Sequence, residues 1–151
     1  MECIITIGLP GSGKSTFREK YLKNNKNTCV ISNDDIIFDI AKTLNVSYST
    51  ALRISDEKEI KKIKIEKVKK AVLNQENIFF DQTNVTLSSR RRCLGFIPKI
   101  YKIKFVVFDI PRCVINHNLF ERYIQTGVYI SNQTVDKFED IFVWPNETEG
   151  Y

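Results

Sequence analysis

Short apolar segments alternate with longer amphipathic segments along the chain. Four segments rich in β-branched and aromatic residues are typical of buried strands: 3–7, 28–32, 77–81 and 103–109. Apolar residues at helical spacing predict helices over about 15–24, 34–44, 88–96, 112–125 and 132–143. Residues 48–74 hold the longest helical segment, and Asp56 could cap it. Strands separated by helices indicate a parallel sheet with helices on both faces. Ligands of such sheets bind at the carboxyl ends of the strands.

Length and composition add only broad limits. The 151 residues suffice for one domain, 1–151, and a hydrophobic content of 42% argues against disorder. The net charge of +5 suits a polyanionic partner without identifying one. We expect no signal peptide, because the first apolar run is short and a glycine loop follows it. We also expect no membrane span, and the sequence indicates no oligomeric state.

The cysteines point to an intracellular, reducing compartment, cytoplasmic or nuclear. Four occur and none forms a C-x-x-C pair, so a zinc site is not expected. Cys3, Cys29 and Cys113 lie in or beside apolar runs, and we expect them to be buried free thiols.

A glycine-rich loop follows the first predicted strand. Residues 8–15, Gly-Leu-Pro-Gly-Ser-Gly-Lys-Ser, fit the G-x-x-x-x-G-K-[ST] phosphate-binding motif, with a strand before it and a helix after it. Lys14 is long enough to reach the β- and γ-phosphates, and the Ser15 hydroxyl suits Mg²⁺. We therefore expect ATP and Mg²⁺ to bind here. The candidate nucleotide-binding residues are Gly8, Pro10, Gly11, Ser12, Gly13, Lys14, Ser15 and Thr16.

Carboxylates follow the second and third predicted strands. Asp34 and Asp35 come directly after the second strand, where one carboxylate can orient a hydroxyl and accept its proton. The alternative is that these residues only cap the next helix. Asp81 closes the third strand, where an acidic residue supports Mg²⁺ directly or through water.

Further polar residues follow Asp81. Thr83 and Asn84 offer hydrogen-bonding side chains to the substrate whose hydroxyl would accept the phosphoryl group. Arg90 and Arg91 belong to the most concentrated positive charge in the chain, which suits either a phosphate backbone or a solvated helix face.

These motifs resemble the P-loop polynucleotide kinase family, especially the phage-type 5′-hydroxyl kinase domain, along most of the chain. The resemblance implies a three-layer P-loop kinase fold, with a parallel sheet of four to five strands and helices on both faces. It also implies ATP-dependent phosphorylation of the 5′-hydroxyl end of DNA or RNA. Asp34 corresponds to the family's general base, and Arg122 lies in a segment similar to the one that carries the lid arginine. Arg90 and Arg91 match an arginine pair after the D-x-T-N segment.

One departure from the family bears on the acceptor. The family's arginine for the acceptor phosphate stands three residues after the base, where this chain has Ile37. Arg53, Arg90 or a helix lysine are possible substitutes. Two other functions stay open: a kinase for a small-molecule hydroxyl, or a nucleotide-binding module without catalysis. Residues 145–151 resemble the P-x-x-x-E-G-[FY] segment of related kinases. In those kinases another strand usually follows this segment, so we expect the sheet to be one strand short here.

Overall fold

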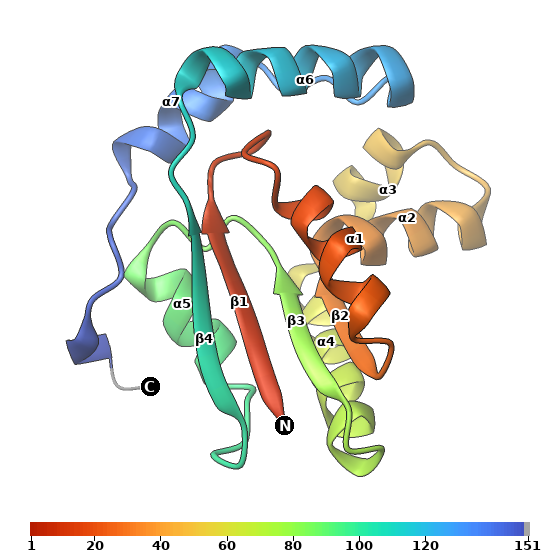
Figure 1. Cartoon of the computed structure of the whole chain (residues 1–151). Coiled ribbons are helices and arrows are strands. Elements are labelled where there is room, and N and C mark those ends of the chain that lie inside the picture. The colour runs from red at the N-terminus through yellow and green to blue at the C-terminus, as the bar shows by residue number, and fades with distance from the viewer. Residues whose placement is uncertain (150–151) are drawn as a thin grey trace.

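The computed structural model describes residues 1–149 and arranges them in three layers, with a parallel sheet between helices (Figure 1). The strand order is β2-β3-β1-β4. The strands are β1 Glu2–Gly8, β2 Thr28–Ser32, β3 Asn77–Asp81 and β4 Lys102–Phe108. The sheet expected from the sequence is confirmed, with four strands among the described residues.

The helices connect the strands and continue beyond the last one. They are α1 Lys14–Asn24, α2 Asn33–Leu44, α3 Tyr48–Ile54, α4 Glu57–Leu73, α5 Leu87–Leu94, α6 Arg112–Thr126, α7 Asn132–Asp140 and the short 3₁₀ helix η1 Glu147–Glu149.

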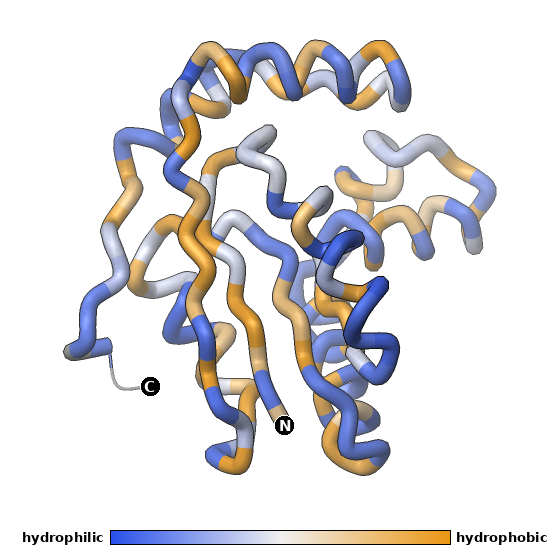
Figure 2. The backbone as a smooth tube through the Cα atoms, viewed as in Figure 1, coloured by the Kyte–Doolittle hydropathy of each residue, from blue (hydrophilic) through white to orange (hydrophobic). Residues whose placement is uncertain are grey.

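Successive residues of a strand point to opposite faces of the sheet, and helices cover both faces. On one side, Phe80 of β3 packs in a cluster with Val68 of α4. On the other side, the ring of its neighbour Phe79 lies 6.0 Å from Phe17 and 5.5 Å from Tyr21, both on α1. The strands are accordingly apolar along much of their length (Figure 2).

Residues 48–74, where the sequence predicts the longest helix with a cap at Asp56, form two helices. Ser47 caps α3 by accepting from the Thr50 amide. Asp56 then caps α4 by accepting from the Lys58 amide. Ser55 and Asp56 have extended backbone between the two helices, and the Asp56 cap stabilises the start of the second one. The cap predicted at Asp56 is therefore confirmed, and the residues before it form a separate helix, α3, which packs against α2.

Two expectations about the surface have different outcomes. Cys3 is buried as expected, Cys29 is only half-buried, and Cys113 is exposed on α6, so the predicted burial of Cys113 is wrong. All three are free thiols. Within residues 1–149, none of the helices combines the length and the hydropathy needed to cross a bilayer.

Arg90 is part of the core. Its side chain is 0% exposed and forms two hydrogen bonds to the Glu149 carboxylate, at 2.8 and 2.6 Å. A further guanidinium nitrogen donates to the carbonyls of Asn84 and Val143. The predicted contact of Arg90 with an acceptor is therefore wrong, because its donors already hold the C-terminal segment against α5. Of the arginine pair, Arg91 is the exposed member.

We expect Arg90→Met to lower the free energy of unfolding by about 3–5 kcal/mol, because the variant leaves the Glu149 carboxylate buried without its partner. Urea unfolding of the purified chain measures the change. The matched control is Arg91→Met, an exposed neighbour that should stay within about 0.5 kcal/mol of the wild type. Equal stabilities of the two variants would contradict the structural role of the Arg90–Glu149 pair.

Candidate active site

The phosphate loop leaves β1 at Gly8 and enters α1 at Lys14. Gly11 and Gly13 have φ values of 79° and 88°, in the left-handed region that favours glycine. Gly13 is the N-cap of α1, and no side chain of the described residues caps that helix end. The amides of the first turn and the positive end of the helix are thus suited to bind phosphate oxygens.

Lys14 lies folded over this loop. Its side chain is 9% exposed, and its Nζ donates to the carbonyls of Gly8 and Leu9 at 3.0 and 2.6 Å. Burial lowers the pKa of Lys14 to about 8, although the charges of Asp81 and Asp34 act in the opposite direction. A phosphate bound at the loop would supply the negative charge that favours the ammonium form.

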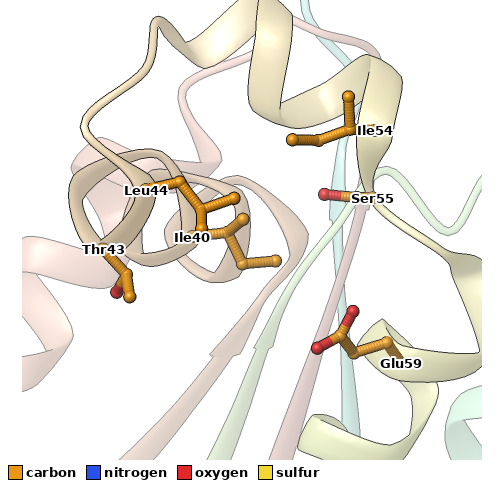
Figure 3. Close-up of a pocket in the computed structure, with 6 residues that line it drawn as sticks. All are labelled: Ile40, Thr43, Leu44, Ile54, Ser55 and Glu59. Atoms are coloured by element: carbon orange, nitrogen blue, oxygen red, sulfur yellow. The ribbon is translucent and has the colours of Figure 1, made fainter.

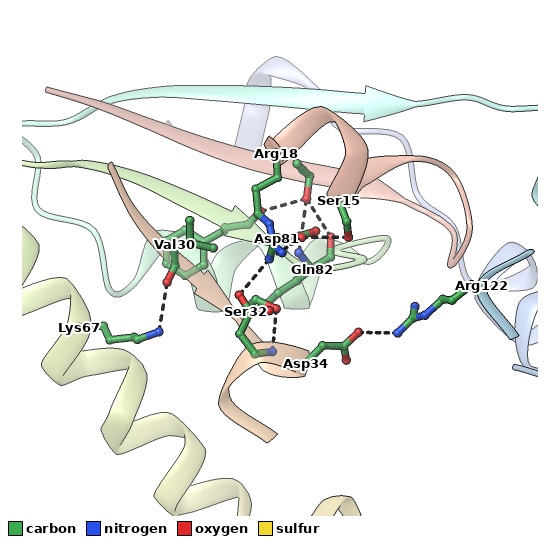
Figure 4. Close-up of polar contacts among 12 residues, drawn as sticks. Ser15, Arg18, Val30, Ser32, Asp34, Lys67, Asp81, Gln82 and Arg122 are labelled. Carbon is green, nitrogen blue, oxygen red and sulfur yellow. Dashed lines mark hydrogen bonds and ion pairs between the residues drawn. The ribbon is translucent and has the colours of Figure 1, made fainter. Parts of the chain in front are cut away.

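Ser15 and Asp81 meet at the edge of the sheet (Figure 4). The Ser15 hydroxyl donates to the Asp81 carboxylate at 3.2 Å. Arg18 lies 3.1 Å from the same carboxylate oxygen and 2.9 Å from Asp35. Burial raises the pKa of Asp81, while Arg18, Lys14 and the Ser15 hydrogen bond lower it. A further cation beside Asp81 would offset the effect of that burial.

This pair of oxygens fits Mg²⁺. Among residues 1–149, no group of three or more His, Cys, Asp or Glu side chains forms a metal cage. Mg²⁺ commonly binds one or two protein oxygens and takes its other ligands from phosphates and water. Ser15 and Asp81, directly beside the phosphate loop, match that ligand set.

Asp34 lies at the start of α2 and is held from two sides. The Tyr48 hydroxyl donates to one carboxylate oxygen at 2.9 Å. Arg122 lies 3.2 Å from the other oxygen (Figure 4). The cap of α2 is Ser32, whose hydroxyl oxygen accepts from the Asp35 amide at 3.2 Å. Because Ser32 fills the capping role, the carboxylate of Asp34 is not needed for it.

Helix α6 brings Arg122 to this place by crossing above the phosphate loop (Figure 1). The Asn118 side chain donates to the Gly11 carbonyl at 2.8 Å. A Cβ built at Gly11 would lie 2.8 Å from Leu119 and 3.0 Å from the Ile115 carbonyl. The glycine at this position therefore allows the helix to rest on the loop.

The remaining predicted residues divide into framework and surface. Asn84 is buried, donates to the Thr6 carbonyl at 2.9 Å and accepts from the Cys93 thiol at 3.3 Å. Its predicted contact with a substrate is therefore wrong, because both ends of its amide have partners within the fold. Thr83 is half-buried, and its carbonyl accepts from the Gly8 amide at 2.9 Å. Thr16 is exposed on α1.

Sequence reasoning missed two residues of this site, Arg18 and Tyr48. Arg18 had a signal, because it stands four residues after Lys14 and so shares its face of α1. Tyr48 had none, because only the packing of α3 against α2 brings its hydroxyl to Asp34.

Two hollows lie on the surface of the described residues, and both are away from the phosphate loop. One, of about 390 Å³, lies between α2, α3 and the start of α4, with Ile40 and Leu44 facing Ile54 and a carboxylate from Glu59 (Figure 3). The other, of about 730 Å³, lies between α4 and the segment after α5 and is lined mostly by apolar side chains. Neither contains a residue of the candidate active site.

A parallel sheet whose central strand runs into a phosphate-binding loop, with helices on both faces, defines a P-loop kinase fold. The chain belongs to the family described as the AAA domain, which matches residues 3–144. No curated protein matches the sequence.

Solved structures agree with this fold. A chain of the Pnkp1/Rnl/Hen1 RNA repair complex superposes with a TM-score of 0.74 at 26% identity, over 91% of this chain and 42% of that one. A second structure of the complex gives 0.58 at 25%, over 76% and 38%. This chain therefore spans less than half of those chains. A gluconokinase from Sinorhizobium meliloti gives 0.59 at 14%, over 97% and 78%, which shows the shared fold. The resemblance to P-loop polynucleotide kinases is supported by these matches.

The buried charge of Lys14 predicts a pH-dependent stability in the absence of nucleotide. Below pH 8 Lys14 is protonated in both states, and burial of the charge destabilises the fold. As the pH rises from about 8 towards 10.5, the folded state loses the proton first, so the unfolded state binds more protons and stability rises. We expect wild type to gain about 2–3 kcal/mol relative to Lys14→Met between roughly pH 7 and pH 10.

Urea unfolding of both proteins at the two pH values measures this difference. Lys20→Met, at an exposed position of the same helix, is the control and should show no such change. A gap between wild type and Lys14→Met that is the same at both pH values would show that the Lys14 charge is not destabilised by burial.

Proposed function

We propose that this chain is an ATP-dependent kinase that phosphorylates the 5′-hydroxyl end of a polynucleotide. The observation that carries the proposal is the position of Asp34. Its carboxylate lies at the same edge of the sheet as Lys14 and Asp81, and Arg122 from the helix above the loop faces it. A proton acceptor and a cation beside a phosphate-binding loop are the groups that phosphoryl transfer to an alcohol requires.

The loop and its flanking side chains would hold the donor. The amides that follow Gly11 and Gly13, together with Lys14, would bind the phosphates of ATP. Ser15 and Asp81 would hold Mg²⁺, which when bound neutralises charge on the phosphate oxygens. Lys14 would exchange the carbonyls that it now contacts for phosphate oxygens.

Asp34 would carry the acceptor side of the reaction. Its carboxylate accepts the proton of the acceptor hydroxyl, whose oxygen forms a bond to the γ-phosphorus while the bond from that phosphorus to the ADP oxygen breaks. Arg122 would stabilise the negative charge of the transferring group. The hydroxyl of Tyr48 orients Asp34 by donating to the other carboxylate oxygen.

A polynucleotide acceptor is supported by the similarity to the RNA repair complex chain and by the net charge of +5. Exposed Arg91 on α5, and Thr83 beside the loop, are candidates for contacts to the strand. One observation favours a small acceptor instead: Ile37, where the family has an acceptor-binding arginine, is buried in a cluster with Ala41 and Ala51. A cation at that position is therefore absent.

An acceptor panel with γ-labelled ATP tests the proposal. The acceptors are DNA and RNA oligonucleotides with a 5′-hydroxyl, a nucleoside, a nucleoside monophosphate and a sugar. We expect label on the oligonucleotides at the 5′ end, because a strand offers phosphates to the basic surface. Label on the nucleoside or sugar alone would reverse the choice of acceptor, and ATP binding without transfer to any acceptor would favour a non-catalytic module.

Variants at the two central residues test the mechanism. Asp34→Asn should lower kcat by about 10²–10⁴-fold, because it removes the proton acceptor while keeping the side-chain shape. Lys14→Ala should lower kcat/KM by orders of magnitude and weaken ATP binding. Asp39→Asn, at an exposed position of the same helix, is the control and should resemble wild type. A kcat of Asp34→Asn within a few-fold of the control would exclude Asp34 as the base.

A further inference from the structure

Two aromatic rings lie beside Asp34. The Tyr48 hydroxyl donates to the Asp34 carboxylate at 2.9 Å, and the Tyr48 ring lies 4.6 Å from the ring of Phe38 between centroids, at 42° between planes. Burial raises the pKa of Tyr48, with the Asp34 charge acting in the same direction, so its hydroxyl stays a donor. The two rings are therefore anchored next to the position where an acceptor hydroxyl would be deprotonated.

The periodicity of α2 puts Phe38 on the same side of the helix as Asp34. Asp34 and Phe38 are four residues apart, which places one above the other on a helix. Ile37 and Ala41 lie on the adjoining side of the helix, which faces the core, and are buried. Phe38 is 44% exposed, so its ring is not part of the core. The helix thus presents an aromatic surface, and not an arginine, beside the proposed base.

We propose that Phe38, packed at a tilt against Tyr48, is a stacking surface for the base of the acceptor's 5′-terminal nucleoside. This inference rests on the proposed function and names the group that replaces the family's arginine. The 5′-hydroxyl and the base of one nucleoside are separated by a single sugar, and Asp34 and Phe38 are joined through a single Tyr48 side chain. One nucleoside therefore spans both contacts.

This contact selects for a base without reading which base it is. Every nucleobase has a π-face, so stacking on an aromatic side chain tolerates all sequences and depends on the area of the base. It also requires no ribose 2′-hydroxyl, so the Phe38 contact itself does not distinguish RNA from DNA. A sugar or another acceptor without an aromatic ring gains nothing from this surface.

The experiment compares two oligonucleotides that both carry a 5′-hydroxyl, one with an ordinary 5′-terminal nucleoside and one with an abasic residue there. We expect the wild type to show a KM about 10-fold higher for the abasic strand, since stacking of one base contributes roughly 5–100-fold in affinity. Phe38→Ala should raise the KM of the ordinary strand to the abasic value and leave that of the abasic strand unchanged. Phe38→Trp should restore the preference for the ordinary strand.

Two controls separate stacking from general damage. The KM for ATP should be the same in the wild type and both Phe38 variants, which shows that the folded site is retained. Trp144→Ala removes another exposed aromatic that has a ring partner, Phe142 at 5.4 Å, and lies in the C-terminal segment away from α2. It should keep the wild-type ratio of the two KM values.

Three results overturn the inference. Equal KM values for the two strands in the wild type show that the terminal base is not bound, whatever the variants do. A preference that survives in Phe38→Ala shows that the base is bound by other residues. Absence of transfer to either strand, with transfer to a small acceptor, overturns the proposed acceptor as well, whereas the first two results leave it standing.

Discussion

The hydrogen bond between Ser15 and Asp81 joins residues 66 positions apart, and the site depends on the constraint behind it. In a parallel sheet all strands end at the same edge, and β1 and β3 are direct neighbours. Whatever follows β1 therefore meets whatever follows β3. The Gly8 amide, which donates to the Thr83 carbonyl, fixes that meeting through the main chain. The register of two strands thus places a hydroxyl, a carboxylate and a lysine within one small volume.

The same arrangement destabilises the isolated fold. Lys14 is buried among neutral carbonyls, which lowers its pKa, and Asp81 is buried enough that its pKa is raised despite Arg18. Each charge lacks part of the solvation that it would have in water. A phosphate beside Lys14 and a dication beside Asp81 would compensate for that lost solvation, which would favour binding of a nucleotide together with its metal. By contrast, Arg90 and Glu149 compensate each other fully inside the fold.

The proposed acceptor side of the site is built from different elements. Helix α2 supplies Asp34 and Phe38, α3 supplies Tyr48, and α6 supplies Arg122 from above the loop. The Asn118 side chain on α6 donates to the Gly11 carbonyl, so α6 and the phosphate loop are in direct contact. Ile37 faces the core, so in the proposed function recognition of the acceptor would rely on the rings of Phe38 and Tyr48 and on the neighbouring surface charge. In this proposal, the residues that would carry phosphoryl transfer and the surface that would select the acceptor come from different elements.

The sequence by itself determined the alternating strands and helices, the phosphate loop and the acidic strand ends, because these depend on local periodicity and on short motifs of fixed geometry. Lys14, Ser15, Asp34 and Asp81 were all identifiable in this way. Only the tertiary structure decided the fate of Arg90 and Asn84, which a motif made candidates for substrate contact and packing made part of the core. It also decided that Ser32, and not Asp34, caps α2, and that Tyr48 reaches Asp34. Burial and partnership between distant segments are properties of the packed chain, and no local pattern encodes which polar side chain finds its partner inside.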